Sequence, residues 1–365
     1  MIKFLDIYNQ DKHIHSFIIN KIRKLFKKGD FILGDEVKIF ERKFALLTKS
    51  KFAIGCANGT DALTLALKSL NLKKGSEVII PAMTYCSTAF SVINANLKPV
   101  LVDIDYKKPT INIDEIKKKI TRNTKVIMPV HLYGSVVEIF KIRKIIKDKG
   151  IFIIDDCAQA HGAKDQKGRP VGSLSDISTF SLYPGKNLGA YSDAGIITTN
   201  LKPNFIKIQK IRNLGSIEKF KHDLIGMNSR LDTIQAIILN EKIKNLNKYN
   251  NKRRAIARFY KKNIKNKKIS QLTYSKNCVY HQYVVLVNDR LKFSKYLDKK
   301  KIQYGFHYPK SIHELEVFKK KNIGKKFPNS ELISKNGISL PIDPNLSMKD
   351  LKFICKNINE FWKHR

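Results

Sequence analysis

Residues 180–190 read Phe180-Ser181-Leu182-Tyr183-Pro184-Gly185-Lys186-Asn187-Leu188-Gly189-Ala190 and place one lysine on a Pro-Gly turn directly after an apolar strand. Proline fixes its own φ angle and glycine permits bends that other residues resist, so this turn holds Lys186 in place. Burial favours the neutral, nucleophilic amine of a lysine, which is the form that Schiff-base chemistry needs. The chain contains 58 lysines, however, so a loop lysine without a chemical role is the simpler interpretation until other residues support it.

The turn belongs to an alternation of strands and helices that lasts to about residue 200. Seven strands are predicted, at 52–56, 77–81, 99–105, 125–131, 151–156, 177–182 and 194–199. Helices are predicted at 35–48, 60–70, 87–94, 113–120, 136–149 and 205–213, after an N-terminal arm and amphipathic helix that end near residue 28. Repeated strand–helix units with apolar strands predict an α/β fold, a mostly parallel seven-stranded sheet covered by helices on both faces.

The pattern changes after two long helices that are predicted at 230–244 and 249–263. Strands at 281–287, 303–308 and 338–341 then mix with helices at 291–301 and 349–363, which predicts a smaller α+β domain. The predicted division is 1–245 for the arm and large domain, and 246–365 for a linking helix and the small domain. An active site between the two is the default expectation.

The net charge and the cysteine pattern limit which classes of protein and partner the sequence allows. The formal net charge of +39 invites a nucleic-acid hypothesis, but 58 Lys against 12 Arg are spread along the whole chain. Nucleic-acid readers favour arginine and concentrate charge on one face, so we predict no nucleic-acid partner and a positive field that attracts an anionic substrate. Five cysteines without a disulfide or paired-ligand pattern, and the lack of a long apolar stretch, predict a cytoplasmic protein with no metal site and no membrane partner.

A glycine and a hydroxyl follow the first predicted strand, in Asn58-Gly59-Thr60-Asp61-Ala62-Leu63. Free backbone N–H groups and the helix dipole favour an anion there, and Thr60 adds a donor. An ordinary helix N-cap at Asn58 or Thr60 is the alternative. The sequence has no GxGxxG or Walker pattern, so dinucleotide-binding and P-loop folds lose support.

Two adjacent carboxylates end the strand at 151–156, in Asp155-Asp156-Cys157-Ala158-Gln159-Ala160-His161-Gly162. Ligands of open α/β sheets bind at this strand end, and neighbouring side chains of a strand point to opposite faces, so one carboxylate can face the crevice. Asp155, Asp156 and His161 could instead bind a cation. Asp156 and Lys186 together are better explained by pyridoxal phosphate, because a carboxylate holds its pyridine nitrogen protonated and makes the ring an electron sink.

Three further residues stand at or just after the ends of predicted strands. Tyr85 follows the strand at 77–81, where an aromatic ring can lie flat against a cofactor, although a core tyrosine is the alternative. His307 and Tyr308 precede a proline, which is a reasonable position on the rim of a pocket.

Together these motifs resemble the DegT-type nucleotide-sugar aminotransferases, over residues 1–363. The resemblance implies the fold-type-I, aspartate-aminotransferase-like architecture with pyridoxal 5'-phosphate as cofactor. The segments that carry it are Phe31-Ile32-Leu33-Gly34, Val37, Phe40-Glu41, 58–63, Val130-His131-Leu132-Tyr133-Gly134, 156–162, 180–190, 226–232 and Gln235-Ala236.

The resemblance assigns roles to residues around the cofactor ring. Lys186 is implied to be the catalytic residue, which forms the Schiff base with the cofactor and later moves protons between carbon centres. Asp156 is implied to pair with the pyridinium nitrogen, and Gln159 to bond the side of the ring that carries the hydroxyl. Tyr85 is implied to stack on the ring.

The resemblance also assigns the anionic contacts. Gly59, Thr60 and Ser181 are implied to hold the cofactor phosphate, and Asn228 to reach it from a partner subunit. A homodimer with active sites at the subunit interface is therefore implied. Arg230, two residues after Asn228, is expected to help bind an anionic substrate or donor.

A narrower resemblance concerns the substrate. In the branch that acts on dTDP-linked 3-keto-6-deoxyhexoses, the counterparts of Tyr183, His307 and Tyr308 lie near the sugar or the incoming carboxylate. One departure stands close by, because Tyr191-Ser192-Asp193 replaces a more glycine-rich stretch and could alter the pocket near the lysine. The segments similar to this branch are 183–190, 212–216 and 306–309.

The expected reaction is transfer of an amino group from L-glutamate to C-3 of a dTDP-6-deoxyhexose, for surface-polysaccharide or glycan assembly. Transfer to C-4 of a UDP- or GDP-linked 4-keto sugar is the nearer alternative. A non-catalytic regulatory or nucleic-acid-binding relative is the alternative of another class, and the intact Lys186, Asp156 and phosphate-site residues argue against it. The nucleotide, the regiochemistry, the stereochemistry and the donor depend on loop contacts that the sequence does not define.

Overall fold

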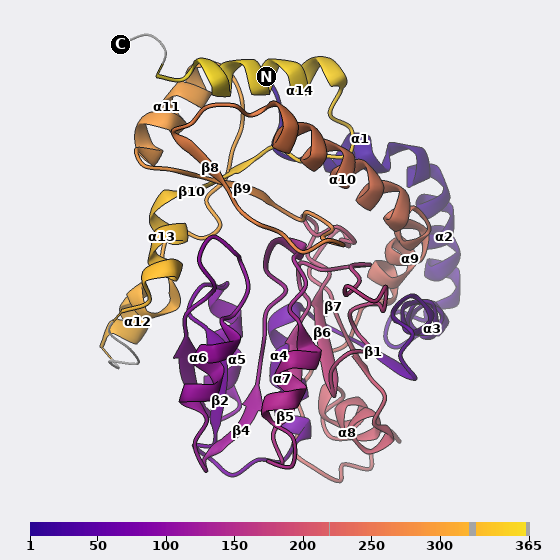
Figure 1. Cartoon of the computed structure of the whole chain (residues 1–365). Helices are drawn as coiled ribbons and strands as arrows, with labels where there is room; N and C mark the ends of the chain where they lie inside the picture. Colours follow the sequence, from indigo (N-terminus) through magenta and orange to yellow (C-terminus); the bar gives the residue numbers. More distant parts are fainter. Residues whose placement is uncertain (219, 321–325, 363–365) are drawn as a thin grey trace.

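The computed structural model describes residues 1–218, 220–320 and 326–362. Within that part of the chain a large sheet forms the centre of the molecule (Figure 1). Its strands are β1 (Phe52–Cys56), β2 (Glu77–Pro81), β3 (Lys98–Val102), β4 (Thr124–Ile127), β5 (Phe152–Asp156), β6 (Ile177–Ser181) and β7 (Gly195–Thr199). The order is β1-β7-β6-β5-β4-β2-β3. Only the pairs that involve β7 are antiparallel, so the predicted mostly parallel, seven-stranded sheet is confirmed.

The described helices cover both faces of this sheet and the smaller sheet beyond it (Figure 1). They are α1 (Ile7–Asp11), α2 (His15–Lys28), α3 (Asp35–Thr48), α4 (Gly59–Ser69), α5 (Cys86–Asn94), α6 (Ile113–Lys119), α7 (Ile139–Ile145), α8 (Lys202–Arg212), α9 (Thr233–Lys242), α10 (Leu246–Asn263), α11 (Arg290–Lys299), α12 (Glu316–Lys319), α13 (Pro328–Asn336) and α14 (Met348–Glu360). None of the described helices is both long and apolar enough to cross a bilayer.

Alternating strand residues explain why both faces need a cover. Ile197 of β7 packs with α4, α5 and α8, whereas its neighbour Ile196 packs with α3 and α9. Ile153 of β5 joins α6 and α7 on that second side. Because successive side chains of a strand point to opposite faces, a strand that is apolar throughout must be covered twice.

The smaller sheet consists of β8 (Ile269–Gln271), β9 (Tyr283–Val287) and β10 (Gly337–Leu340), in the antiparallel order β10-β9-β8. The strand predicted at 303–308 is wrong. Only isolated bridges form there, Ile302 with Ile2 and Gly305 with Ser339, because the chain then leaves the sheet and carries His307 and Tyr308 into the pocket described below. The division into domains at residue 245 stays a prediction, and Ile312 of the later segment packs into the core of the large sheet.

The helix predicted at 136–149 is shorter, since α7 spans Ile139–Ile145. The backbone N–H of Val136 donates to Ser275 Oγ at 2.8 Å, and that of Val137 donates to His131 Nδ1 at 3.0 Å. These two N–H groups bond to side chains outside the helix, and α7 begins at Ile139.

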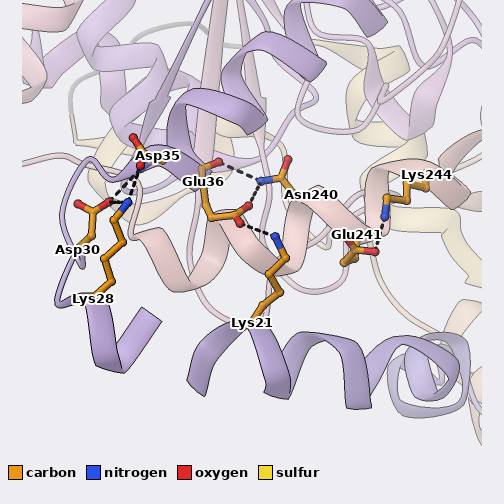
Figure 2. A network of polar contacts seen from close by, with 8 residues as sticks. All are labelled: Lys21, Lys28, Asp30, Asp35, Glu36, Asn240, Glu241 and Lys244. Atoms are coloured by element: carbon orange, nitrogen blue, oxygen red, sulfur yellow. Dashed lines mark hydrogen bonds and ion pairs between the residues drawn. The ribbon is translucent and has the colours of Figure 1, made fainter. Parts of the chain in front are cut away.

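Polar contacts join α2 to α3 and α9 (Figure 2). Lys21 Nζ of α2 lies 2.8 Å from Glu36 Oε1 of α3, and Asn240 Nδ2 of α9 donates to the other Glu36 oxygen at 2.9 Å. Half-exposed ion pairs contribute about 0–1 kcal/mol each. The burial of Ile18 of α2 against Ile237 of α9 is therefore the larger source of stability at this contact.

A buried ion pair connects the end of α9 to the N-terminal arm. Lys242 Nζ lies 2.7 Å from Asp11 Oδ2, with side chains 5% and 1% exposed, and burial lowers the pKa of Lys242. We expect Lys242→Met to lower the free energy of unfolding by about 3–5 kcal/mol, because it leaves the Asp11 carboxylate buried without its cation. Denaturant unfolding measures the change. Recovery of most of the loss in the Asp11→Asn, Lys242→Met double variant is expected, and a single variant within about 1 kcal/mol of wild type would contradict this account.

Candidate active site

One pocket lies at the carboxyl ends of the central strands, where the large sheet meets Phe4 and Leu5 of the N-terminal arm and residues between His281 and Tyr308. Its volume is about 530 Å³. Ten of the residues singled out by sequence line it: Gly59, Thr60, Tyr85, Asp156, Gln159, Ser181, Tyr183, Lys186, His307 and Tyr308. The two others, Asn228 and Arg230, are not among the lining residues that the structure describes.

Lys186 stands on a tight turn that follows β6. Its backbone N–H donates to Tyr183 O at 2.9 Å, and Ala190 N–H donates back to Leu182 O at 2.7 Å. A Cβ at Gly189 would lie 2.4 Å from Pro184 O, so the turn requires glycine there. Loss of hydration lowers the pKa of Lys186 to about 8, with the Asp156 carboxylate opposing the shift. A sizeable fraction of this amine is therefore neutral near neutral pH.

Asp156 is the carboxylate that faces the pocket. Its Oδ1 accepts from Ala158 N–H at 3.1 Å and its Oδ2 accepts from Thr88 Oγ1 at 2.8 Å. Burial raises the pKa of Asp156, while these two hydrogen bonds and the charge of Lys186 oppose that rise. The two bonds fix the direction of the carboxylate and leave it able to pair with a cationic group in the pocket.

Asp155 faces away from the pocket, as the alternation along a strand predicts. It accepts a hydrogen bond from Ser175 Oγ, and its Oδ2 lies 3.3 Å from His131 Nε2. His131 Nδ1 accepts from a backbone N–H, so in the neutral ring Nε2 carries the proton. Among the described residues, the acid, histidine and cysteine side chains close enough together to share a metal ion are His131, Asp155 and Cys157. The alternative cation site made of Asp155, Asp156 and His161 therefore gains no support.

The N-terminus of α4 opens into the pocket beside Ser181. Asn58 caps the helix, since its Oδ1 accepts from Asp61 N–H at 2.8 Å, and Gly59 and Thr60 then line the pocket. Thr60 Oγ1 donates to Ser87 Oγ at 2.8 Å. The N-cap interpretation and the anion interpretation are thus compatible. Hydroxyl groups around free N–H groups at a helix N-terminus fit a phosphate.

Gly59 leaves no room for a side chain. A Cβ built there would lie 2.5 Å from Ser181 Cβ. We expect Gly59→Ala to cost about 1–3 kcal/mol of stability, because Ser181 must shift, and to weaken phosphate-cofactor binding roughly tenfold. Thermal unfolding and titration of the apo-protein with cofactor measure the two effects. Gly185→Ala is the matched control for stability, since its Cβ would meet its nearest atom at 3.7 Å, and equal losses in both variants would contradict the steric explanation.

Gln159 and two tyrosines form another wall. Gln159 Oε1 accepts from Tyr133 N–H at 2.6 Å, and its Nε2 donates to Tyr308 OH at 2.7 Å. The rings of Tyr85 and Tyr308 are 5.2 Å apart. Tyr85 is 53% exposed, so it is a surface of the pocket rather than a core tyrosine.

His307 enters the pocket from the segment between Gly305, which bridges to β10, and Tyr308. Its Nδ1 lies 2.8 Å from Ser339 Oγ, and its ring stacks on Phe4 at 5.8 Å. Burial lowers the pKa of His307 to about 4, so the ring is neutral at neutral pH. Its surroundings therefore suit an uncharged hydrogen-bonding role.

Sequence reasoning missed several lining residues. Phe4 N–H donates to Gln303 Oε1 at 2.8 Å, a contact across 299 positions that no local pattern reveals. Asp193 falls in the stretch that departs from the family pattern, and that departure was the only signal for it. The lining residues not singled out include Phe4, Leu5, Ser87, Thr88, His281 and Gln282.

These features define a class of protein. A seven-stranded, mostly parallel sheet carries a lysine of lowered pKa, a buried aspartate and a helix N-terminus that fits an anion around one pocket. This is the fold-type-I architecture of pyridoxal-phosphate-dependent transferases, and the donor set fits the cofactor.

The chain belongs to the DegT/DnrJ/EryC1/StrS aminotransferase family, whose sequence profile matches residues 12–359. It is 40% identical over 365 residues to a dTDP-3-amino-3,6-dideoxy-alpha-D-galactopyranose transaminase of Aneurinibacillus thermoaerophilus, with 99% of both chains covered. It is 35% identical to a UDP-N-acetyl-3-dehydro-alpha-D-glucosamine 3-aminotransferase of Acidithiobacillus ferrooxidans, with 93% of this chain and 92% of the relative covered.

Solved structures of related proteins support the same family assignment. Streptomyces venezuelae DesV superimposes with a TM-score of 0.96 at 30% identity, covering 100% of this chain and 99% of DesV. NtdA of Bacillus subtilis, solved with bound cofactor PMP, superimposes with a TM-score of 0.90 at 27% identity, covering 98% of this chain and 84% of NtdA. The protein is thus a nucleotide-sugar aminotransferase that uses pyridoxal 5'-phosphate.

Proposed function

We propose that the enzyme transfers an amino group from L-glutamate to C-3 of a dTDP-linked 3-keto-6-deoxyhexose and so makes the 3-amino sugar. The observation that carries this proposal is the placement of Tyr183, His307 and Tyr308 around Lys186 in one pocket. These residues match the dTDP-sugar branch, and the relative at 40% identity is named for a dTDP-3-amino sugar.

Each residue of the pocket has a distinct proposed part. The cofactor, when bound, supplies an electron sink that stabilises negative charge on the substrate carbon. The amine of Lys186 holds the cofactor covalently and then moves the proton at the reacting carbon of the substrate. A pKa of about 8 suits this amine for proton transfer near neutral pH. Asp156 pairs with the pyridine nitrogen, while Gly59, Thr60 and Ser181 hold the phosphate.

The aromatic wall has a proposed part in orientation. Tyr85 lies against the ring of the cofactor, and Gln159 bonds its hydroxyl side. Tyr308 is held by Gln159 at 2.7 Å and faces the sugar together with Tyr183 and His307. These contacts position the keto carbon against Lys186 and exclude water from it.

We also propose a homodimer whose active sites lie at the subunit interface. No arginine of this chain is among the described residues that line its pocket, although both substrates are anionic. Arg230 instead donates to Asn213 Oδ1 at 3.2 Å, outside the pocket, and Asn228 pairs with the same residue. The loop between Asn213 and Asn228 exposes apolar side chains, with Ile225 98% exposed. In the proposed dimer the partner subunit's Asn228 reaches the phosphate and the partner subunit's Arg230 meets an anionic group.

Mixing two inactive variants tests this arrangement. If the sites are shared, Lys186→Ala dimers exchanged with Asn228→Ala dimers form heterodimers with one intact site, which restores about a quarter of wild-type activity by statistics. The measurement is turnover after subunit exchange, with each variant alone as control. A mixture no more active than the variants alone would place Asn228 and Lys186 in the same subunit's site.

A panel of keto sugars tests the substrate. The proposal expects the highest kcat/KM for a dTDP-linked 3-keto-6-deoxyhexose, with the amino group at C-3 established by NMR of the product. Higher kcat/KM for a UDP- or GDP-linked 4-keto sugar would favour the C-4 alternative. No turnover in the panel, together with steeply salt-dependent DNA binding, would favour the non-catalytic alternative.

A further inference from the structure

Two consecutive residues at the entrance of β9 line the pocket and have no part in the mechanism above. His281 and Gln282 are 8% and 6% exposed, and both contribute to the pocket wall. The backbone N–H of His281 donates to Tyr133 O at 2.9 Å, and Tyr133 is in turn bound by Gln159. This segment is therefore held rigidly against the cofactor-binding wall.

Hydrogen bonds of Asn187 determine which nitrogen of His281 carries the proton. Asn187 Nδ2 donates to Asn250 Oδ1 at 2.9 Å and to Val279 O at 3.1 Å. Its Oδ1, which can only accept, lies 3.2 Å from His281 Nδ1. His281 Nδ1 must therefore be the protonated nitrogen.

The other nitrogen of His281 is consequently an acceptor. Burial and the neighbouring cations, Lys186 first among them, keep the pKa of His281 well below its usual range, so the ring stays neutral. Gln282 Nε2 lies 3.5 Å from His281 Nε2, at the limit of a hydrogen bond. Gln282 Oε1 is buried and has no hydrogen-bond partner among residues 1–218, 220–320 and 326–362.

We propose that His281 and Gln282 form an acceptor wall that binds a hydroxyl group of the sugar next to the reacting carbon. Gln282 Oε1 is the buried acceptor of this wall that lacks a partner among the described residues, and a sugar hydroxyl group that reaches it supplies the missing donor. A carboxylate brings only more lone pairs, so the two acceptor atoms, Gln282 Oε1 and His281 Nε2, disfavour the carboxylates of the amino donor at this position. The same pocket accepts both substrates in turn, and this wall gives it a part that recognises only the sugar. The inference rests on the proposed function.

Gln282→Met tests the wall without touching the bond between His281 and Asn187. The expected result is a roughly tenfold weaker binding of the dTDP-3-amino sugar in titration calorimetry, because a buried hydrogen bond is lost. Affinity for dTDP alone is expected to be unchanged, since the contact is with the sugar. Gln166→Met is the matched control, as Gln166 is an exposed loop glutamine that bonds to Glu138, and it is expected to bind the sugar as wild type does.

His281→Phe and His281→Gln separate hydrogen bonding from shape. The first keeps a ring without an acceptor and is expected to lose about as much sugar affinity as Gln282→Met, whereas the second keeps an acceptor and recovers part of it. In separate half-reactions, followed by the absorbance of the bound cofactor, the loss is expected on the sugar side, with less than about a threefold change for L-glutamate.

Sugars that lack the C-2 or the C-4 hydroxyl identify the group that is bound. Wild type and Gln282→Met should bind one of these two deoxy sugars with equal affinity, because the hydroxyl group that contacts the wall is missing from both complexes. Equal losses for dTDP alone or for L-glutamate, or unchanged sugar affinity in both Gln282→Met and His281→Phe, would overturn the inference while leaving the proposed function intact. If wild type binds no dTDP-sugar, the proposed function and this inference fail together.

Discussion

Lys186→Ala is expected to lower the turnover of the nucleotide sugar by at least about 10⁴-fold, the upper range for loss of a proton-transferring group. Lys186 is the only lysine among the described residues that line the pocket, so no neighbour can replace it. Lys186→Arg should be equally inactive, because a guanidinium stays protonated at any pH the protein tolerates. Lys167→Ala, on an exposed turn, is the control. Steady-state rates with L-glutamate measure the effect, and more than about 1% residual activity in both Lys186 variants would remove the residue from its proposed role.

The lowered pKa of Lys186 predicts how the apo-protein takes up its cofactor. Only the neutral amine attacks an aldehyde, and with a pKa of about 8 the rate of uptake should rise with pH and level off above that value. At pH 6 about 1% of the amine is neutral, so uptake there should be roughly fifty times slower than at pH 8. Stopped-flow absorbance measures the rate. A midpoint near 10 would mean that the amine is fully hydrated.

Asp156→Asn is expected to lower kcat/KM by about 10²–10³-fold, comparable to the loss of one preorganised electrostatic contact in other enzymes. Asparagine keeps the size of the side chain. Its Oδ1 can accept from Ala158 N–H while its Nδ2 donates to the Thr88 hydroxyl, so the main effect of the change is loss of the negative charge. Thr88→Val is the companion variant, since it keeps the charge and removes only one of its hydrogen bonds, and a smaller loss of about tenfold is expected from it. Steady-state kinetics test both variants. An Asp156→Asn enzyme with a third or more of wild-type activity would contradict the pairing of Asp156 with the pyridine nitrogen.

The local sequence pattern was sufficient to predict a strand or helix whose apolar residues form a clear run or period with definite ends. The predicted bounds of β1, β2 and α3 agree with the structure. The apolar run of β2 ends at Pro81, and the helical period of α3 ends at Thr48. The local pattern was insufficient where tertiary contacts decide. The stretch 303–308 has the composition of a strand, yet only Gly305 bridges to β10 before the chain turns towards the pocket. The strand β8 is three residues long, too short for an alternating pattern to reveal.

The same distinction holds for the site. Asp156, Gln159 and Lys186 follow strand ends, so their meeting at one edge of the sheet could be predicted. Phe4 and Gln282 could not, because their places depend on contacts of the arm with Gln303 and of the 279–282 segment with Tyr133. Asn228 lies outside the pocket of its own chain, and its proposed part needs a second subunit.

The most direct test of the central claim is the visible absorption spectrum of the purified protein before and after addition of L-glutamate. The account predicts a yellow protein whose visible band bleaches with L-glutamate and returns when a dTDP-linked 3-keto sugar is supplied, while Lys186→Ala lacks the response. A protein that stays colourless when pyridoxal phosphate is added, or whose band does not respond to any amino donor, would contradict it.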